Sequence, residues 1–459
     1  MNNLIFKRFF FITLLLLLIN ELGSKEEYQP VFSYEDTSHP TVGTGGMVVS
    51  QRKMASEVGA SILANGGNAV DAAVATAFAL SVVLPRAGNL GGGGFMLVYL
   101  SELDKTIAID YREKAPSEAT RDLFLDENGN YDKNKARFSL LSAGVPGTVA
   151  GLSYALEKYG TLSWKEVISP SIKLAEEGFE VTRDIENVLT IYKNRLTLNQ
   201  ATAEAYYKKD RVPYKAGEIL KLPDLAWSLK QLRDFGPQAF YEGEIAKKIV
   251  SEMEKNGGLI TLKDLKNYHV SERIPVKGTY KGFEIVSMPP SSSGGVHLIQ
   301  MLNMLEFHSL NKMGFGSSES IHLLVEVMKR AYADRSKFLG DSDFVEVPLL
   351  GLTSKEYAKN LLSKISLTQA TPSNEVLVGN PVPYESPDTT HFSVMDDKGN
   401  AVSNTYTLNF SYGSGIVIPG TGFFINNEMD DFSSKPGQPN AFGLLGEKSN
   451  AIEANKRPL

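Results

Sequence analysis

The stretch Pro387–Asn409, PDTTHFSVMDDKGNAVSNTYTLN, contains two strand-like runs separated by one turn. The runs His391–Met395 and Ala401–Leu408 are rich in β-branched and aromatic residues, which favour strands. Between them, Asp396–Asn400 (DDKGN) has the composition of a hairpin turn. The stretch therefore predicts an antiparallel β-hairpin.

Hydroxyl and amide side chains gather at the open end of this predicted hairpin. A turn centred just after Lys398 would set Thr390 opposite Thr407. Thr389 would then lie diagonal to Thr407 and near Asn409. Taken alone, the arrangement also fits a purely structural threonine pair, because such pairs stabilise many sheets.

The rest of the chain alternates between helical and strand-like patterns. Residues Ala55–Leu84 read as two helices parted by the turn Asn65–Asn68, and the second helix is apolar on nearly every face, as in a buried layer. The middle, Leu152–Leu265, reads mainly as amphipathic helices. Further strands are expected at Gly94–Leu100, Thr106–Tyr111 and Gly282–Met288. Because no low-complexity linker interrupts the pattern, we expect one continuous α/β domain.

Composition restricts the classes of function. The 459 residues include 47 Lys and Arg against 53 Asp and Glu, for a formal net charge of −6, and no Cys. A chain without basic excess is a poor candidate for nucleic-acid binding. Without cysteine there are no thiol nucleophiles, thiolate metal sites or disulfides. Catalysis would therefore have to use oxygen, nitrogen or a bound ion.

Other clusters that could suggest a cofactor have structural explanations. The run Gly91–Gly94 lacks the Lys-Ser/Thr of a phosphate loop and precedes a strand, so it predicts close backbone packing under a site. Asp126–Asn130 has its glycine in the wrong place for a calcium loop and predicts a surface turn. Ser291–Gly295 is not a nucleophile elbow. The six histidines show no zinc-binding spacing, so we expect neither a metal nor a cofactor.

Residues 1–23 have the order of a secretory signal peptide. Lys7 and Arg8 precede the apolar run Phe9–Ile19, and the small residues Gly23 and Ser24 follow it. The run has eleven residues, whereas a membrane-spanning helix takes about 20. The pattern favours cleavage near Ser24 and a periplasmic or secreted protein over the alternative of a membrane anchor.

Short motifs follow one another along the whole mature chain. In order, they are Gly66–Ala73, Gly91–Gly94, Tyr111–Glu113, Pro146–Gly151, Ser287–Gly295, Asp388–Val394, Thr405–Asn409, Asn426–Ser433 and Asn455–Leu459. Together they resemble the γ-glutamyltranspeptidases. The resemblance implies the four-layer αββα fold of the N-terminal nucleophile hydrolases and a precursor that cuts itself between Asp388 and Thr389. Residues 24–388 would form a large subunit and residues 389–459 would begin a small one.

Cleavage would supply both the nucleophile and its base. The new α-amine of Thr389, with a pKa of about 8, could accept the proton of the neighbouring hydroxyl. Thr389 would then attack the γ-amide of glutathione or another γ-glutamyl compound. The resulting acyl group would pass to water or to an amino acid or dipeptide acceptor.

The resemblance also implies roles for residues outside the cleavage point. Thr407 would hydrogen-bond and position the Thr389 hydroxyl. Arg112 would pair with the α-carboxylate of the γ-glutamyl group, a task that suits its planar, two-pronged guanidinium. The α-amino end of that group would be held by Asn409, Glu428 and Asp431.

Two features depart from the family pattern. The chain stops at Leu459. The family continues from there into a serine pair that binds substrate and a glycine pair that forms the oxyanion hole. The C-terminal part of the fold is therefore expected to be missing, and a truncated, non-catalytic remnant is one alternative function. Phe442 occupies the place of a lid tyrosine that can bond the asparagine matching Asn409, which predicts a looser lid. A cephalosporin or glutaryl acylase of the same fold is a second alternative, although Arg112 and Asp431 favour an amino acid head group.

Overall fold

The computed structural model of the chain describes residues 41–378, 390–435, 446 and 448–459. Gly45–Leu459 form one compact unit, and Met1–Thr44 are a separate unit of which residues 41–44 are described. The predicted signal peptide, residues 1–23, lies outside the described residues. Within the described part, no helix combines the length and apolarity needed to cross a bilayer.

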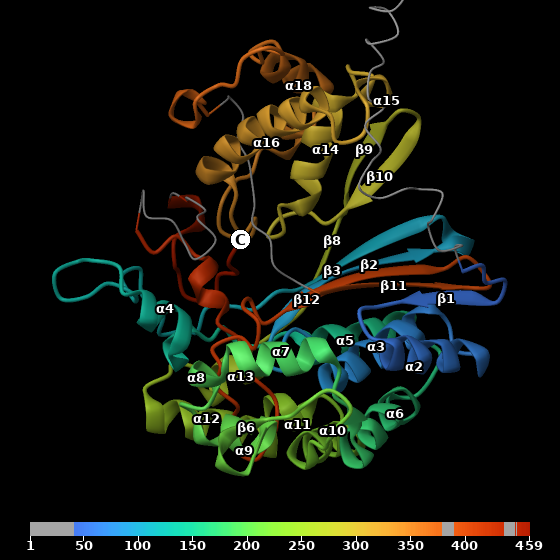
Figure 1. Cartoon of the computed structure of the whole chain (residues 1–459), viewed down its shortest axis with the longest axis vertical. Coiled ribbons are helices and arrows are strands. Elements are labelled where there is room, and N and C mark those ends of the chain that lie inside the picture. The colour runs from blue at the N-terminus through green and yellow to red at the C-terminus, as the bar shows by residue number, and fades with distance from the viewer. Residues whose placement is uncertain (1–40, 379–389, 436–445, 447) are drawn as a thin grey trace, which may run out of the picture. The chain divides into compact units, whose positions relative to one another are not determined.

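An antiparallel sheet of six strands forms the centre of the unit Gly45–Leu459 (Figure 1). Its order is β1-β11-β12-β2-β3-β8, so the predicted hairpin lies between strands from the N-terminal part of the chain. The strands are β1 (Gly46–Val49), β11 (Thr390–Asp396), β12 (Ala401–Thr407), β2 (Gly93–Leu100), β3 (Lys105–Tyr111) and β8 (Ser271–Arg273). The sheet therefore requires chain segments about 300 residues apart to fold together.

The hairpin forms as predicted, but with a different register. Thr390 faces Tyr406, not Thr407, so the predicted pairing is wrong by one residue. Because side chains alternate between the faces of a sheet, Thr390 and Thr407 point to opposite faces. Thr407 is the residue of β12 that directly follows the last pair of the ladder.

The turn explains the shift in register. The backbone N–H of Asp396 donates to the carbonyl of Asn400 at 3.0 Å, which leaves three residues in the loop. Gly399, the third of them, has φ +81°, a left-handed conformation that glycine adopts without strain. A three-residue loop is centred on Lys398 itself, whereas the prediction placed the centre after it.

Helices cover one face of the sheet (Figure 1). Phe392 and Val394 of β11 share a core cluster with residues of α3. All fifteen residues of α3 are buried, which confirms the predicted buried helix. Asn68 starts α3 with a capping box, in which its side chain accepts hydrogen bonds from the N–H groups of Val70 and Asp71. The helices of this layer are α2 (Lys53–Ala64), α3 (Ala69–Val83), α5 (Thr148–Tyr159) and α6 (Trp164–Glu177).

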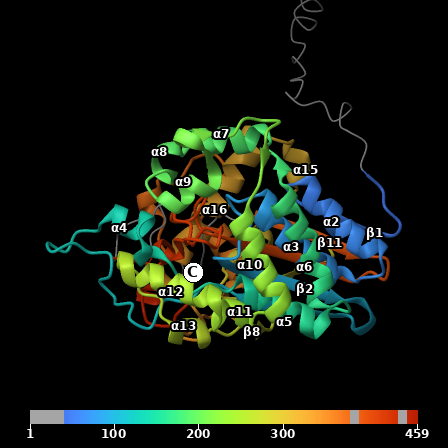
Figure 2. The same cartoon turned by 90° about the horizontal axis from the view of Figure 1, so that it is seen from below.

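A second helical region packs beyond this layer (Figure 2). Its helices are α7 (Arg183–Ile191), α8 (Lys193–Leu196), α9 (Gln200–Tyr206), α10 (Pro223–Phe235), α11 (Gln238–Tyr241), α12 (Glu244–Asn256) and α13 (Leu262–Lys266). The short helix α4 (Lys133–Phe138) instead contacts residues Glu428–Asp431. The second helical region contains two short antiparallel strand pairs. In one, β4 (Phe179–Glu180) pairs with β7 (Ile219–Leu220), and in the other, β5 (Tyr207–Lys208) pairs with β6 (Val212–Pro213). The predicted helical middle of the chain is confirmed.

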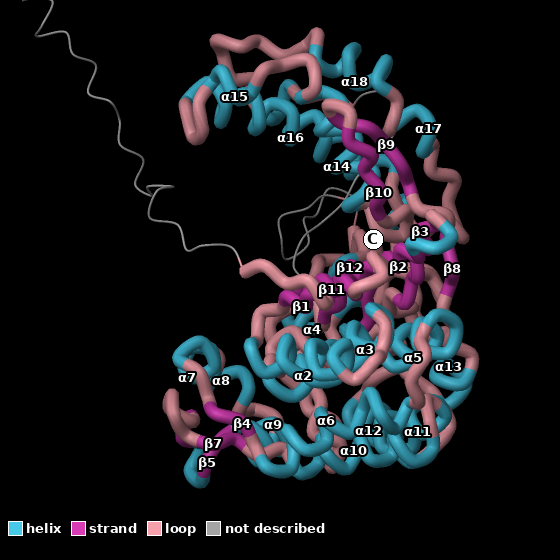
Figure 3. The backbone as a smooth tube through the Cα atoms, turned by 90° about the vertical axis from the view of Figure 1, so that its right-hand side faces the viewer, coloured by secondary structure: helices cyan, strands magenta, loops and turns pink. Residues whose placement is uncertain are grey.

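A smaller group of elements lies on the other side of the sheet (Figure 3). The antiparallel pair β9 (Val276–Tyr280) and β10 (Phe283–Ser287) packs against α14 (Gly294–Leu305). This group has its own apolar core, which includes Val296, Leu323 and Ala358. The other helices of the group are α15 (Leu310–Met313), α16 (Ser318–Phe338), α17 (Leu349–Leu352) and α18 (Lys355–Leu362). The six-stranded sheet thus carries a packed helical layer on one face and has the group of α14–α18 on its other side, in keeping with the predicted α/β class. On that second side His391, Ser393 and Met395 of β11 remain exposed.

Candidate active site

The glycine run Gly91–Gly94 lies directly against the end of β12. A Cβ atom at Gly92 would come within 1.9 Å of the Thr407 carbonyl oxygen, and one at Gly94 within 2.3 Å of the Thr405 carbonyl oxygen. At Gly93 it would come within 2.5 Å of Glu113 Oε2. No larger residue fits there. The prediction of close backbone packing at this run is therefore confirmed.

Two of the predicted site residues shape the end of β12. The hydroxyl of buried Thr407 accepts a hydrogen bond from the backbone N–H of Asn409 at 2.8 Å. Asn409 has φ +72°, in the left-handed region that asparagine tolerates better than most residues. Its Nδ2 donates to the Asn427 carbonyl at 3.0 Å. These bonds turn the chain after β12 towards residues 427–431.

Arg112 joins two predicted acidic residues in a buried cluster. It follows β3, and its Nη2 donates to Asp431 Oδ2 at 2.7 Å. Its Nη1 donates to Glu428 Oε1. Both acids belong to the 3-10 helix η6 (Glu428–Asp431), and all three side chains are buried. Arg112 is therefore not part of a surface ion pair.

Asn426, for which the sequence predicted no individual role, anchors η6. Its Oδ1 accepts hydrogen bonds from the N–H groups of Gly144 at 2.8 Å and Glu428 at 3.0 Å. Its Nδ2 donates to the carbonyls of Gly91 and Gly144, both at 2.8 Å. A buried amide with four bonds holds the acidic helix against the glycine run. The Asn426–Ser433 motif was the available signal.

Glu113 adds a third carboxyl group to the cluster, and the sequence analysis did not predict a role for it. It is fully buried, and its carboxyl group lies within hydrogen-bonding distance of that of Glu428. Among the described residues, no N–H or O–H group donates to Glu113, to Glu428 Oε2 or to Asp431 Oδ1. One guanidinium thus contacts or adjoins three carboxyl groups, with Arg335 of α16 as a more distant positive charge.

Burial dominates the electrostatics of this cluster. It raises the pKa of Glu113 to about 7 and that of Asp431 to about 6, although the charge of Arg112 opposes both changes. Burial and the neighbouring carboxylates also raise the pKa of Glu428. The negative charges are incompletely compensated, so protons or another cation would stabilise the cluster.

The raised pKa of Glu113 predicts a loss of stability towards neutral pH. Between its ordinary pKa of 4.5 and about 7, the unfolded chain has lost this proton while the folded chain retains it. The free energy of unfolding should therefore fall as the pH rises through this range. Urea unfolding at pH 5 and pH 7 measures the difference. Glu113→Gln should make the free energy of unfolding depend less on pH, whereas Glu254→Gln, at an exposed residue, should leave that dependence as in the wild type. Equal changes between pH 5 and pH 7 in the wild type and both variants would contradict the prediction.

Three predicted residues lie outside the part of the chain that the structure describes: Asp388 and Thr389 at the expected cleavage point, and Phe442 in the expected lid. Thr407, Asn409, Arg112, Glu428 and Asp431 are all described. Of these, Arg112, Glu428 and Asp431 are in direct contact. No group of three or more histidine or acidic side chains in the described segments is arranged to hold a metal ion.

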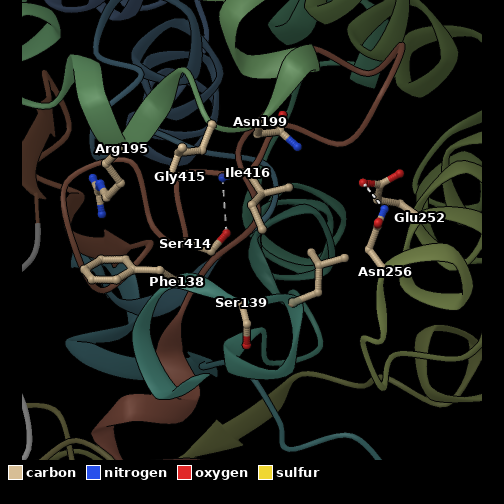
Figure 4. A pocket seen from close by; sticks show the side chains of 11 residues that line it. Phe138, Ser139, Arg195, Asn199, Glu252, Asn256, Ser414, Gly415 and Ile416 are labelled. Atoms are coloured by element: carbon tan, nitrogen blue, oxygen red, sulfur yellow. Dashed lines mark hydrogen bonds between the residues drawn. The ribbon is translucent and has the colours of Figure 1, made fainter. Parts of the chain in front are cut away.

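A separate pocket of about 290 Å³ lies in the helical region (Figure 4). Arg195, Glu252 and Ser414 are among its lining residues. Another lining residue, Phe138, packs 6.2 Å from the ring of Phe410, which directly follows Asn409. The pocket therefore neighbours the end of β12 but contains no residue of the Arg112 cluster.

Comparison with known proteins identifies the family. The family model described as gamma-glutamyltranspeptidase matches residues 55–459. The chain is 50% identical over 433 residues to the glutathione hydrolase proenzyme of Escherichia coli strain K12, covering 94% of this chain and 74% of that protein.

Solved structures agree with the sequence comparison. The γ-glutamyltranspeptidase of Helicobacter pylori is 42% identical with a TM-score of 0.73, covering 76% of this chain and 100% of that chain. The cephalosporin acylase of Bacillus halodurans is 27% identical with a TM-score of 0.80, covering 94% of this chain and 76% of that chain. These likenesses confirm the predicted fold class. The chain belongs to the γ-glutamyltranspeptidase family.

Proposed function

We propose that the chain is an exported precursor of a γ-glutamyltransferase and glutathione hydrolase. Residues 1–23 would direct export to the periplasm or the exterior. Cleavage between Asp388 and Thr389 would separate residues 24–388 from residues 389–459, which remain together as large and small subunits. The relative from Escherichia coli is itself named a glutathione hydrolase proenzyme. Its name supports both glutathione as a donor and maturation from a precursor.

The observation that carries the proposal is the buried cluster of one arginine and three carboxyl groups. A γ-glutamyl group has an α-carboxylate and an α-ammonium on the same carbon. Arg112 has the fork geometry that binds a carboxylate. Glu428 Oε2 and Asp431 Oδ1 receive no hydrogen bond from a described N–H or O–H group, so both can accept one from the ammonium. Asn409, at the end of β12, would contact the same end of the substrate.

Catalysis would begin at Thr389, the residue directly before β11. Its α-amine would take the hydroxyl proton while the oxygen attacks the γ-carbonyl carbon. The same proton would pass to the departing amine when the amide bond breaks. Water or the amine of an amino acid or dipeptide would then attack the acyl-enzyme and release Thr389. Thr407 lies one residue beyond Tyr406, which pairs with Thr390 of β11. Its hydroxyl would orient the nucleophile.

An acylase that removes glutaryl groups is the second candidate, because a cephalosporin acylase shares the fold over most of this chain. A glutaryl group carries a carboxylate but no α-ammonium. It would therefore leave Glu428 and Asp431 without the cation that their surplus negative charge favours. The cluster supports the γ-glutamyl substrate over the glutaryl one.

Hydrolysis of two anilides distinguishes the candidates. We expect the purified chain to release 4-nitroaniline from γ-glutamyl-4-nitroanilide much faster than from glutaryl-4-nitroanilide. Glycylglycine should accelerate the first reaction by acting as an acceptor. Faster turnover of the glutaryl compound would instead support the acylase. No turnover of either compound would contradict both.

A further inference from the structure

The segment Asn455–Leu459 runs beside the residues that follow β3. The backbone N–H of Asn455 donates to the Ala115 carbonyl at 3.0 Å, and the N–H of Ala115 donates to the Lys456 carbonyl at 2.8 Å. Arg112 Nε donates to the Pro458 carbonyl at 3.3 Å. The segment is therefore bonded both to the backbone near Arg112 and to the Arg112 side chain.

Arg457 is a deeply buried cation of this segment, at 1% exposure. Its backbone N–H donates to Asp341 Oδ2 at 2.9 Å, and its Nη1 donates to Asp343 Oδ2 at 3.3 Å. Its Nε lies 3.4 Å from Asp110 Oδ1. Its Nη2 donates to the His269 carbonyl and to Ser271 Oγ, both at 3.1 Å. Every one of these partners lies before the proposed cleavage point.

Asp110 connects Arg457 to Arg112. This fully buried residue of β3 accepts a hydrogen bond at Oδ1 from the backbone N–H of Arg112 at 3.0 Å. Its Oδ2 accepts one from Arg273 Nε at 2.6 Å. Arg273 in turn donates to both carboxylate oxygens of Asp343 at 2.9 Å. Two arginines and three aspartates thus form one network, with the backbone of Arg112 attached to it.

The network is sensitive to the loss of one member. Without Arg457, Asp110 and Asp341 would remain fully buried with one cation fewer, in an environment where an unpaired charge is costly. Movement of the Asp110 carboxylate towards Arg273 would release the N–H of Arg112. The guanidinium of Arg112 would then lose the backbone position from which it reaches the substrate.

We propose that Arg457 is a positioning residue that holds Arg112 in place for the substrate α-carboxylate by joining its segment to Asp110, Asp341 and Asp343. The inference rests on the proposed function, because it takes Arg112 as the carboxylate-binding group. It extends that function by making carboxylate recognition depend on a contact between the two proposed subunits.

Binding of two amino acids to the full chain tests the role of Arg457. L-glutamate and 4-aminobutyrate differ only in the α-carboxylate, and calorimetry gives the dissociation constant of each. We expect the wild-type chain to prefer L-glutamate. Arg457→Met should weaken L-glutamate binding at least about tenfold, the equivalent of one charge-assisted hydrogen bond, with 4-aminobutyrate little changed. Arg457→Lys, which keeps the charge, should recover part of the loss, and the exposed Lys448→Met should behave as wild type.

The outcomes separate this inference from the proposed function. An unchanged preference for L-glutamate in Arg457→Met, even with reduced thermal stability, would overturn the inference alone. A wild-type chain that binds L-glutamate and 4-aminobutyrate equally would overturn both the inference and the proposed role of Arg112. Self-cleavage of the same protein reports independently on the proposed role of Thr389. If Arg457→Met does not fold, Asp343→Asn replaces it in the test, because the Asp343 side chain is half-exposed. Asp343→Asn should weaken L-glutamate binding, by less than expected for Arg457→Met. Unchanged L-glutamate binding in Asp343→Asn would overturn the inference.

Discussion

Thr389→Ala is expected to yield one uncleaved polypeptide with no measurable γ-glutamyl hydrolysis. Methyl cannot replace the hydroxyl as a nucleophile, and without cleavage the α-amine of residue 389 stays in a peptide bond. Removal of an enzyme's nucleophile costs on the order of 10⁶-fold in kcat. Intact mass of the purified secreted protein, measured beside the wild type, detects the first effect. Release of 4-nitroaniline detects the second.

Thr389→Ser is the matched control, because it keeps the hydroxyl and removes one methyl group. It should yield two fragments that meet at the same bond and should retain activity. Wild-type protein that stays a single chain would contradict the proposed maturation. Two fragments in Thr389→Ala would show that another residue performs the cleavage.

Arg112→Met is expected to be the most destabilising substitution in the substrate cluster. It leaves Glu113, Glu428 and Asp431 buried without their shared cation. Breaking a buried ion pair by removing one partner costs about 3–5 kcal/mol. Urea unfolding at pH 7 measures the loss. The loss should be smaller at pH 5, because the three carboxyl groups, whose pKa values burial raises, then take up protons more readily.

Two further variants check the cause of this loss. Arg233→Met removes a partly exposed arginine paired with its neighbour Asp234, and it should change the free energy of unfolding much less than Arg112→Met does. Adding Glu428→Gln to Arg112→Met should restore part of the stability, because it removes one of the unpaired charges. A cost for Arg112→Met no larger than that for Arg233→Met would contradict the electrostatic explanation.

Local patterns in the sequence were sufficient to predict the individual elements. The turn Asn65–Asn68, with apolar residues on every side of the following helix, indicated a buried α3. The DDKGN turn and its flanking β-branched residues indicated the hairpin. The glycines of Gly91–Gly94, without a phosphate-loop lysine, indicated close backbone packing. Each of these features depends on residues that are neighbours in the chain.

The register of the hairpin could not be obtained in the same way. Both a two-residue and a three-residue loop fit the composition of Asp396–Asn400. A difference of one residue in loop length shifts the register by one, and that shift decides whether Thr407 lies opposite Thr390 on the same face of the sheet. Likewise, the resemblance implied site roles for Arg112, Glu428 and Asp431. It placed Glu113 in the Tyr111–Glu113 motif, but no local pattern indicated that this carboxyl group is buried beside the other two acids.

The sequence by itself determined the family, the α/β class and the hairpin, because motif identity and periodicity are properties of the chain. It also predicted most of the candidate site residues. Only the tertiary structure decided that Glu113 joins the acids of η6, that Arg112 lies among them, and that Arg457 reaches Asp110 across 347 positions in the chain. Charge and pKa in these clusters depend on burial and on distances between residues far apart in sequence. Those quantities exist only once the sheet has brought distant segments of the chain together.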